Sequence, residues 1–314
     1  MNFRTKIKID KLPNDWLINH KKQLFLMGSC FSDNVGERLK NAGFSAISNP
    51  FGTLYNPFSI CQNIERLLQD CPFEENDLFF QNGLWHSFSH HSSFSCIDKK
   101  ECLKNINKHF LSAQEGLLNA DFLFLTLGTA WVFKRKENGE IVSNCHKIPA
   151  KEFLREKLSV DTVVKRLEET ILLLKQKNPM IKIVLSVSPI RHLGDGFHEN
   201  QLSKSTLLLA IDELCKQQNI KYFPSYEIVL DDLRDYRFFA DDMAHPSPLA
   251  VDYIWEKFGE MFFDESTQQL SFRVEKLKKS FAHRPFNPNS EEYQKFLLSL
   301  EKERKILEKQ GIVI

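Results

Sequence analysis

Two short segments, far apart in the chain, hold side chains that together can perform acyl transfer. The first is Gly28-Ser29-Cys30, which offers a hydroxyl and a thiol after an apolar run, and the second is a loop in which Asp242 precedes His245 by three residues. At that spacing a carboxylate can orient one ring nitrogen of an imidazole, so that the other accepts a proton from a nucleophile. For this loop the alternative interpretation is that Asp242 only caps the turn and His245 is an exposed side chain without a catalytic role. The residue types favour a nucleophile at Ser29 or Cys30 with Asp242 and His245 as its base.

The position of the first segment supports the same interpretation. Residues 24–27 are expected to form a buried strand and residues 32–42 a helix, so the turn lies at the carboxyl end of a strand, where open α/β sheets bind ligands. N–H groups at the start of a helix lower the pKa of a thiol and stabilise an oxyanion. From residue chemistry alone a second interpretation stays open, in which Ser29 only caps the helix and Cys30 is a buried core residue.

Two further segments carry polar side chains. Arg191 and His192 follow a predicted strand, on the side where a substrate would lie. Arg191 can hold an anionic group by two parallel hydrogen bonds or can satisfy loop carbonyls, and both interpretations remain open. Cys145, His146 and the histidines of residues 85–91 suggest a metal, but their spacing matches no closed zinc pattern. We therefore expect no metal, and interpret these side chains as structural or pocket-lining.

Short apolar runs that alternate with amphipathic stretches predict the elements that must hold these residues. This alternation is typical of an α/β fold with a mainly parallel sheet. The expected strands are residues 24–27, 122–127, 181–187 and 220–223, and the expected helices include residues 32–42, 160–174, 207–214 and 248–262. Residues 79–94 and 131–142 break the alternation and are expected to form hairpins above the sheet, and residues 194–200 a long loop.

The composition shifts after residue 263. Residues 274–281 and 290–309 have helical apolar spacing within a highly charged stretch. We therefore predict a core domain over residues 1–263 and a C-terminal helical extension over residues 264–314. The extension packs on the core or on a second subunit, so a homo-oligomer through these helices is possible.

The bulk composition limits the classes of function. The chain has 314 residues, of which 42% are hydrophobic, so a large core can form. With 42 basic and 41 acidic residues the net charge is +1, which argues against nucleic acid and membrane surfaces as partners. Residues 1–22 resemble no signal peptide, no run is long enough to span a membrane, and the seven cysteines form no CxxC pair. These features predict a reduced, cytoplasmic protein.

Several segments resemble a known family. Residues 28–32, Gly-Ser-Cys-Phe-Ser, resemble the motif that names the GSCFA family, which ends in alanine where this chain has Ser32. Further similar segments follow in the family's order, and the resemblance covers about residues 20–262. These segments are residues 49–57, 127–130, 144–147, 188–192 and 242–246.

The family is similar to the SGNH (GDSL-like) hydrolases, and this implies a fold and a site. The fold would be a flavodoxin-like three-layer α/β/α sandwich, and the activity would be on acyl or acetyl esters without a cofactor. The Asp-x-x-His block of those enzymes falls on Asp242 and His245. Their Gly-Asp-Ser turn, laid over residues 28–30, puts Cys30 at the nucleophile position, whereas a shift of one residue puts Ser29 there.

The resemblance also implies a set of groups that stabilise the oxyanion. The backbone N–H groups of Cys30 and Gly52 would be two donors, but the place of the usual asparagine is held by Ala130, which cannot donate. Loss of one such donor costs about 3–4 kcal/mol in the barrier. Asn56 or a nearby backbone N–H would then have to compensate, and Gly128 would belong, with Asn56, Arg191 and His192, to the substrate-binding residues.

The expected function is therefore the hydrolysis of an ester, or acyl transfer to another hydroxyl, on a small-molecule or carbohydrate ester. A non-catalytic module that binds a glycan or another ligand on the same scaffold is the alternative, favoured by the unusual nucleophile and by Ala130. A metal-dependent hydrolase that uses the Cys and His segments is a third candidate.

Overall fold

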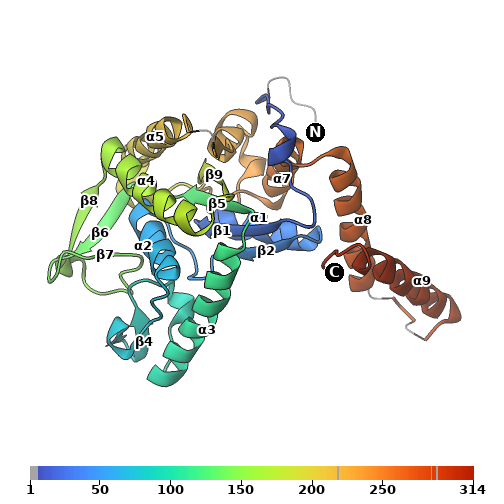
Figure 1. Cartoon of the computed structure of the whole chain (residues 1–314), viewed down its shortest axis with the longest axis horizontal. Coiled ribbons are helices and arrows are strands. Elements are labelled where there is room, and N and C mark those ends of the chain that lie inside the picture. The colour runs from blue at the N-terminus through green and yellow to red at the C-terminus, as the bar shows by residue number, and fades with distance from the viewer. Residues whose placement is uncertain (1–5, 218, 284, 288) are drawn as a thin grey trace.

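The computed structural model describes residues 6–217, 219–283, 285–287 and 289–314. Within these ranges five strands form one parallel sheet in the order β10-β9-β5-β1-β2 (Figure 1). Counted only within this sheet, the strands follow the order 2-1-3-4-5, which is the flavodoxin-like order. The sheet consists of β1 (Gln23–Gly28), β2 (Ser45–Ser48), β5 (Phe122–Leu127), β9 (Lys182–Val187) and β10 (Ile220–Tyr222).

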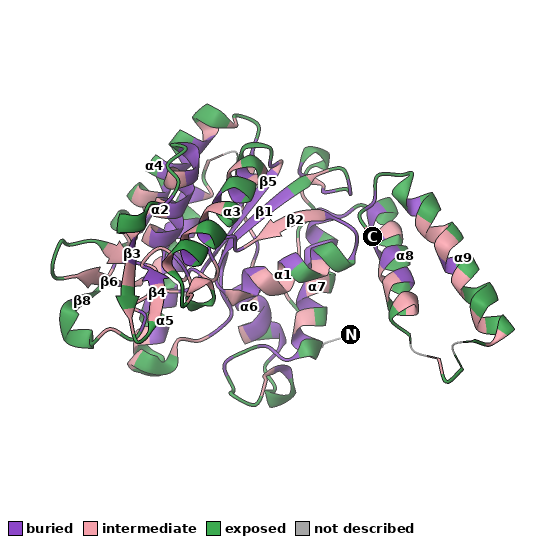
Figure 2. Ribbon diagram, turned by 90° about the horizontal axis from the view of Figure 1, so that it is seen from below, coloured by how far each residue is buried: buried purple, intermediate pink, exposed green. Residues whose placement is uncertain are grey.

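Helices cover both faces of the sheet, so the predicted three-layer α/β/α sandwich is confirmed (Figure 2). One face packs against α2 (Pro57–Leu68), α3 (Lys99–Leu118), α4 (Val160–Lys177) and α5 (Gly196–Leu214). The other face packs against α1 (Cys30–Asn41) and α7 (Pro248–Phe262). The central strands are mostly apolar, with polar residues only at Gln23, Thr126, Lys182 and Ser186, because both of their faces are buried.

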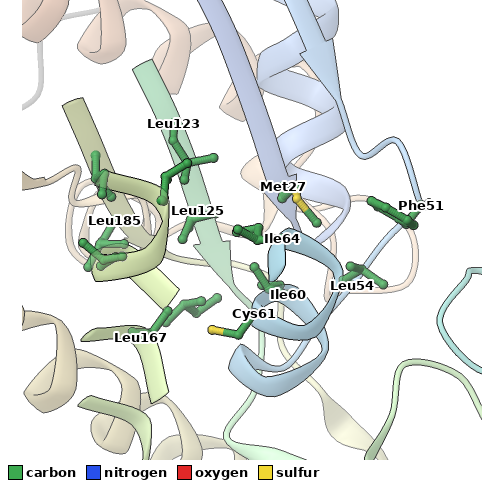
Figure 3. Packing of buried hydrophobic residues seen from close by; sticks show 14 of the residues in the cluster. Met27, Phe51, Leu54, Ile60, Cys61, Ile64, Leu123, Leu125, Leu167 and Leu185 are labelled. Atoms are coloured by element: carbon green, nitrogen blue, oxygen red, sulfur yellow. The ribbon is translucent and has the colours of Figure 1, made fainter. Parts of the chain in front are cut away.

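The packing on the first face rests on short contacts between aliphatic side chains. Figure 3 shows Ile60 and Ile64 of α2 beside Leu125 of β5, with Leu185 of β9 and Leu167 of α4 completing the layer. All of these side chains are buried. A core this continuous holds the carboxyl ends of the strands in fixed positions, which a catalytic site requires.

Two small antiparallel sheets interrupt the alternation where the sequence predicts hairpins. One pairs β3 (Leu78–Gln81) with β4 (Leu84–Ser87), and the other consists of β6 (Trp131–Arg135), β7 (Ile141–Val142) and β8 (Phe153–Lys157). The expectation of a long loop over residues 194–200 is wrong. Gly196, at φ +83°, lets the chain turn into α5, which begins there, well before the expected helix over residues 207–214.

The C-terminal residues form a helical hairpin, as predicted, with α8 (Glu265–Ala282) and α9 (Glu291–Glu308). The hairpin contacts the core near the end of α1, where the Lys278 ammonium donates to the carbonyl of Lys40 at 2.7 Å and the N–H of Val313 donates to that of Gly43 at 3.3 Å. Its own small core consists of Val274, Leu277, Leu300, Leu307 and Ile312.

The remaining elements are short. They are η1 (Asn14–Trp16), η2 (Glu75–Asp77), η3 (Ser92–Phe94), η4 (Ala150–Glu152), η5 (Leu193–Asp195), α6 (Ser225–Glu227), η6 (Ile228–Asp232) and η7 (Tyr236–Phe238). Among the described residues, none of the helices combines the length and the apolar character that a membrane span needs.

Candidate active site

The turn after β1 is fixed by contacts with β5 on one side and with the loop between β2 and α2 on the other. Gly28 has φ +139°, and a Cβ built on it would lie 2.1 Å from the carbonyl oxygen of Thr126 on β5. The N–H of Gly28 donates to the side-chain oxygen of Asn49 at 2.9 Å, and its carbonyl accepts from Leu54 at 2.8 Å. The N–H of Ser29 donates to Thr126 at 3.0 Å. These contacts hold Ser29 and Cys30 at the carboxyl edge of the sheet.

We expect Gly28→Ala to destabilise the protein by about 3 kcal/mol or more, since the new methyl group meets a backbone oxygen at a backbone angle that suits glycine. Urea unfolding measures this. Gly194→Ala is the control, because no atom lies within 4 Å of its added Cβ, and it should stay near wild type. A Gly28→Ala protein as stable as wild type would show that the turn is not held as described.

The two candidate nucleophiles lie in different surroundings. The Ser29 side chain is 1% exposed and caps α1, with its hydroxyl accepting from the N–H of Phe31 at 3.3 Å. Cys30 is the first residue of α1 and is half-buried, and its Sγ lies 3.7 Å from Nε2 of His245. Of the two side chains, the thiol is therefore the one that contacts the imidazole.

The loop before α7 brings Asp242 and His245 together as the sequence predicts. Oδ2 of Asp242 lies 2.5 Å from Nδ1 of His245, while Oδ1 accepts from the N–H groups of Ala244 at 3.0 Å and His245 at 2.9 Å. The His245 and Ala244 N–H groups, followed by the imidazole, lower the pKa of Asp242 to about 2. With Nδ1–H donating to this carboxylate, Nε2 is left as an acceptor that faces the thiol.

The aspartate therefore both caps the turn and orients the histidine. Met243 adopts φ +57° at the tip of the loop, and the N–H of Ala240 donates to the carbonyl of His245 at 2.8 Å, which closes the loop. The side chains of His245 and Asp242 are 50% and 51% exposed, so the pair is open to solvent.

The electrostatics of the thiol differ from the expectation that the helix start lowers its pKa. Burial, followed by the charge of Asp33, raises the pKa of Cys30, and this outweighs the lowering by its own N–H, by Lys204 and by the N–H of Phe31. The resting side chain is therefore a neutral thiol. A base is needed to activate it, and Nε2 of His245 lies in the position of that base.

The expected oxyanion donors fit only in part. Cys30 begins α1, so its N–H has no acceptor within the helix, and it faces the thiol. The N–H of Gly52 is already used, because it donates to the carbonyl of Asn49 at 2.7 Å, and its assignment as a free donor is wrong. Ala130 is fully buried and its N–H donates to Ser203 at 2.8 Å.

Two residues assigned to substrate binding are used by the fold instead. The side chain of Asn56 caps α2, accepting from the N–H of Ser59 at 2.8 Å and donating to its hydroxyl at 2.9 Å, although Asn56 also lies in the wall of a cleft. Gly128 is buried, its N–H donates to the carbonyl of Tyr55 at 2.7 Å, and a Cβ added to it would lie 3.0 Å from that carbonyl oxygen. The substrate-binding assignment of Gly128 is therefore wrong.

A cleft of about 560 Å³ opens between the β6–β8 sheet and the carboxyl edge of the main sheet. Its wall mixes aromatic and polar side chains, including Tyr55, Trp131, Asn144 and His192. The rings of Tyr55 and His192 meet edge to face, with centroids 5.0 Å apart. Tyr55 lines this cleft, and burial, followed by the charges of Cys30 and Asp33, raises the pKa of its phenol.

Arg191 and His192 do not share one wall. Arg191 lines a second hollow, of about 520 Å³, together with Phe197, Tyr236 and Met243. His192 lines the first cleft, and burial, followed by the charge of Lys204, lowers its pKa to about 4, so its ring is neutral at physiological pH. Met243, from the loop that carries His245, lines the second hollow. The first cleft adjoins the site through Tyr55 and His192, whose pKa values respond to the charges of Cys30 and His245.

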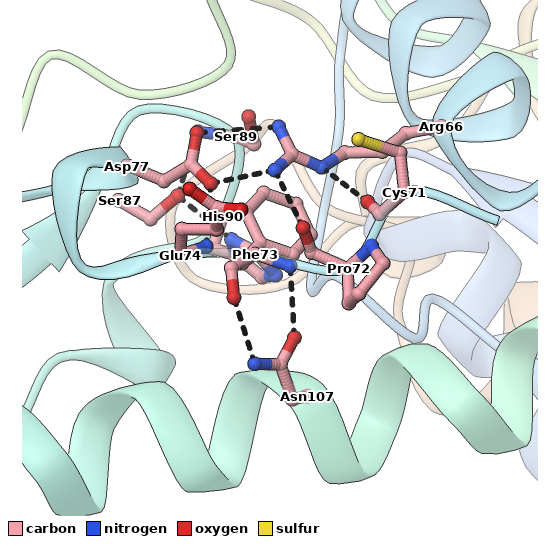
Figure 4. A network of polar contacts seen from close by, with 10 residues as sticks. All are labelled: Arg66, Cys71, Pro72, Phe73, Glu74, Asp77, Ser87, Ser89, His90 and Asn107. Carbon is pink, nitrogen blue, oxygen red and sulfur yellow. Dashed lines mark hydrogen bonds and ion pairs between the residues drawn. The ribbon is translucent and has the colours of Figure 1, made fainter. Parts of the chain in front are cut away.

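The histidine-rich segments form a buried cluster with aromatic side chains. In the part of the chain that the structure describes, no group of His, Cys, Asp and Glu has the arrangement of a metal site. The rings of His86 and His146 are tilted by 37° with centroids 4.5 Å apart, and His90 packs on Phe51 and Phe73. Figure 4 shows His90 beside Phe73, where Arg66 bonds the carboxylate of Asp77 and the carbonyls of Cys71 and Pro72.

This cluster makes the fold sensitive to acid. Burial, followed by the charge of Arg66, lowers the pKa of His90 to about 3, whereas an unfolded chain binds the proton near pH 6.5. Between these values only the unfolded state binds the proton, so stability is full above about pH 6.5 and decreases as the pH falls, by about 1.4 kcal/mol per pH unit.

We expect His90→Asn to reduce the difference in unfolding free energy between pH 7 and pH 5 by about 2 kcal/mol, measured by urea unfolding at both values. The exposed His283, in the C-terminal extension, provides the matched control, and His283→Asn should leave this difference unchanged. An equal pH dependence in wild type and His90→Asn would contradict the assignment.

Three residues at the site were not identified from the sequence. Asn49 holds the nucleophile turn, Tyr55 faces the thiol, and Lys204 is buried behind it. A signal for Lys204 exists, because helical spacing places it on the same face of α5 as Leu207 and Ile211, which are both buried.

Comparison with known proteins identifies related sequences and folds. The family profile described as GSCFA family matches residues 23–258, and a second, described as GSCFA domain protein, C-terminal domain, matches residues 274–311. A carbohydrate esterase family 3 structure from Talaromyces cellulolyticus is 9% identical, with a TM-score of 0.35, over 79% of this chain and 98% of that chain. The comparison with curated proteins finds no match.

Two other solved structures are similar to the chain at the same level. An acetyl esterase mutant with acetate ion is 11% identical, with a TM-score of 0.36, over 80% of this chain and 98% of that chain. An acetyl xylan esterase from the rumen bacterium Butyrivibrio proteoclasticus is 13% identical, with a TM-score of 0.36, over 78% of this chain and 66% of that chain.

Proposed function

This chain belongs to the GSCFA family, and on that premise we propose that it is an ester hydrolase or acyltransferase with the Cys30 thiol as its nucleophile. One observation carries the proposal: Sγ of Cys30 lies 3.7 Å from Nε2 of His245, whose Nδ1 lies 2.5 Å from the carboxylate of Asp242. A nucleophile, a base and a group that orients the base are thus in line, which is the geometric signature of covalent acyl transfer.

The reaction would proceed in two halves. Nε2 of His245 takes the proton of the thiol while Sγ forms a bond to the carbonyl carbon of the ester. The oxyanion lies against the N–H of Cys30, and its collapse breaks the bond to the alkoxide, which receives the proton from His245. The remaining thioester is attacked by water or by an acceptor hydroxyl, with His245 again as the base, and the thiol is restored.

The hollow that Met243 lines and the cleft that adjoins the site at Tyr55 and His192 suggest where the substrate lies. The cleft with Tyr55 and His192 mixes aromatic faces with amide and hydroxyl groups, a lining that suits a polar, ring-containing alcohol such as a sugar. Arg191 in the second hollow offers a guanidinium for an anionic or carbonyl group at the other end. An acylated carbohydrate is therefore the substrate class that we favour.

A non-catalytic binding function is the second candidate, because two observations weaken catalysis. Ala130 offers no donor to an oxyanion, and the pKa of the Cys30 thiol is raised. The cleft would then hold a glycan without cleaving it.

Assays on the purified protein distinguish these functions. We expect turnover of p-nitrophenyl acetate and release of acetate from peracetylated oligosaccharides, unchanged by a chelator and lost after alkylation of Cys30. Binding of an unmodified oligosaccharide by calorimetry without any turnover would support the binding module instead. Loss of turnover on chelation, restored by zinc, would overturn the proposal in favour of a metal-dependent hydrolase.

A further inference from the structure

A buried lysine lies behind the site without a carboxylate partner. Lys204 of α5 is 1% exposed, and its ammonium donates to the carbonyls of Gly128 at 2.6 Å and Ser188 at 2.8 Å. Within the described ranges, none of the ion pairs includes Lys204. A buried ammonium that lacks an anionic partner is costly, so its presence calls for an explanation beyond ordinary packing.

The position of this ammonium relative to the thiol follows from the sheet. Gly128 and Ser188 directly follow β5 and β9, so the charge lies at the carboxyl edge between these two strands. β5 also pairs with β1, which leads into Cys30, and neighbouring strands lie about 4.8 Å apart. The ammonium is thus about one strand away from the nucleophile turn, inside the protein, where charges interact strongly.

The titration behaviour agrees with this placement. Burial lowers the pKa of Lys204 to about 7, and the Cys30 thiolate is the charge that opposes this lowering. In return, the charge of Lys204 lowers the pKa of Cys30. The other charged or titratable groups that face the thiol are His245 from its loop, Asp33 on α1 and Tyr55 before α2, and the neutral ring of His192 faces Lys204.

We propose that Lys204 is a positioning residue of this site, which ties the ends of β5 and β9 together and stabilises negative charge on Cys30 through its buried ammonium. Its role in catalysis rests on the proposed acyl transfer, whereas its effect on the reactivity of the thiol can be tested without any substrate.

The test is the rate of alkylation of Cys30 by iodoacetamide as a function of pH. Trypsin releases residues 23–38, in which Cys30 is the one cysteine, so mass spectrometry follows this thiol separately from the others. Lys204→Gln keeps an amide that can donate to the two carbonyls but removes the charge. At pH 6, where Lys204 is charged in the wild type, we expect alkylation to be about tenfold slower in the variant, which corresponds to one pKa unit.

The pH dependence separates charge from structure. Above pH 7 the wild-type lysine loses its own proton, so the difference between wild type and Lys204→Gln should shrink by pH 9. His245, Asp33 and Tyr55 are the same in both proteins, so the ratio of rates isolates Lys204. A ratio that is the same at pH 6 and pH 9, or equal to one at both, would overturn the proposal.

Two further variants keep the test decisive. Lys257→Met removes another buried lysine, which pairs with Glu260 on α7 away from the site, and it should react like wild type at both pH values. If Lys204→Gln does not fold, Lys204→Arg retains a charge that does not titrate in this range. Its alkylation rate should then rise more steeply than the wild-type rate between pH 7 and pH 8, and identical profiles would refute the role of the charge. Because the alkylation assay needs no ester turnover, its outcome does not depend on whether the protein is an active esterase.

Discussion

Cys30→Ala is expected to lower kcat for ester cleavage by about 10⁴-fold or more, because no other described side chain contacts Nε2 of His245 as a nucleophile would. The fold should be unaffected, since the thiol is half-buried and, among the described residues, makes no other hydrogen bond to a side chain. Hydrolysis of p-nitrophenyl acetate under saturating conditions measures the loss.

Ser29→Ala is the matched control for this experiment, and it addresses the alternative nucleophile directly. Ser29 caps α1 through its contact with the N–H of Phe31, so its loss should cost about 1 kcal/mol of stability but leave turnover within a few-fold of wild type. A protein that loses turnover on Ser29→Ala and retains it on Cys30→Ala would reverse our assignment.

His245→Ala is expected to lower kcat by about 10³-fold, because the thiol has a raised pKa and depends on Nε2 to remove its proton. Asp242→Asn should lower kcat by about 10²-fold, since an amide can leave the imidazole in the wrong tautomer or orientation. Asp242 lies half-exposed, which makes its effect smaller than that of a buried partner.

A control variant and the pH profile test the predictions for Asp242 and His245. Asp241→Asn changes an exposed carboxylate next in sequence and should leave kcat unchanged. Because the pKa of Asp242 is lowered to about 2, this group stays ionised from neutral pH down to about pH 3 and should contribute no step to the pH profile of wild-type activity in that range. Equal activities in wild type and His245→Ala would show that His245 is not the base.

Much of the fold could be predicted from the sequence, because the central strands are buried on both faces. Residues 24–27 and 122–127 are continuous apolar runs bounded by turn residues, and these signals are local. The edge strand β2 (Ser45–Ser48) was missed because its side chains are partly exposed and half polar. The start of α5 was missed because its first turns carry mostly exposed polar side chains.

The site was predictable where its chemistry is local and not where it depends on contacts across the fold. The spacing of Asp242 and His245 alone indicates their hydrogen bond, and the structure places them as expected. Gly52 was wrongly assigned because the turn that ties its N–H to Asn49 cannot be seen in a linear pattern. Lys204 was missed because its two acceptors follow separate strands, and only the folded sheet brings them together.

The most direct test of the central claim is to trap the acyl-enzyme. The protein is mixed with a reactive acyl ester, quenched in acid within the first turnovers and digested, and residues 23–38 are fragmented in a mass spectrometer. We expect one acyl group on Sγ of Cys30, removed by neutral hydroxylamine as a thioester is, and no acyl group in Cys30→Ala. An acyl group on Ser29, or steady turnover with no acyl group on residues 23–38, would contradict the account.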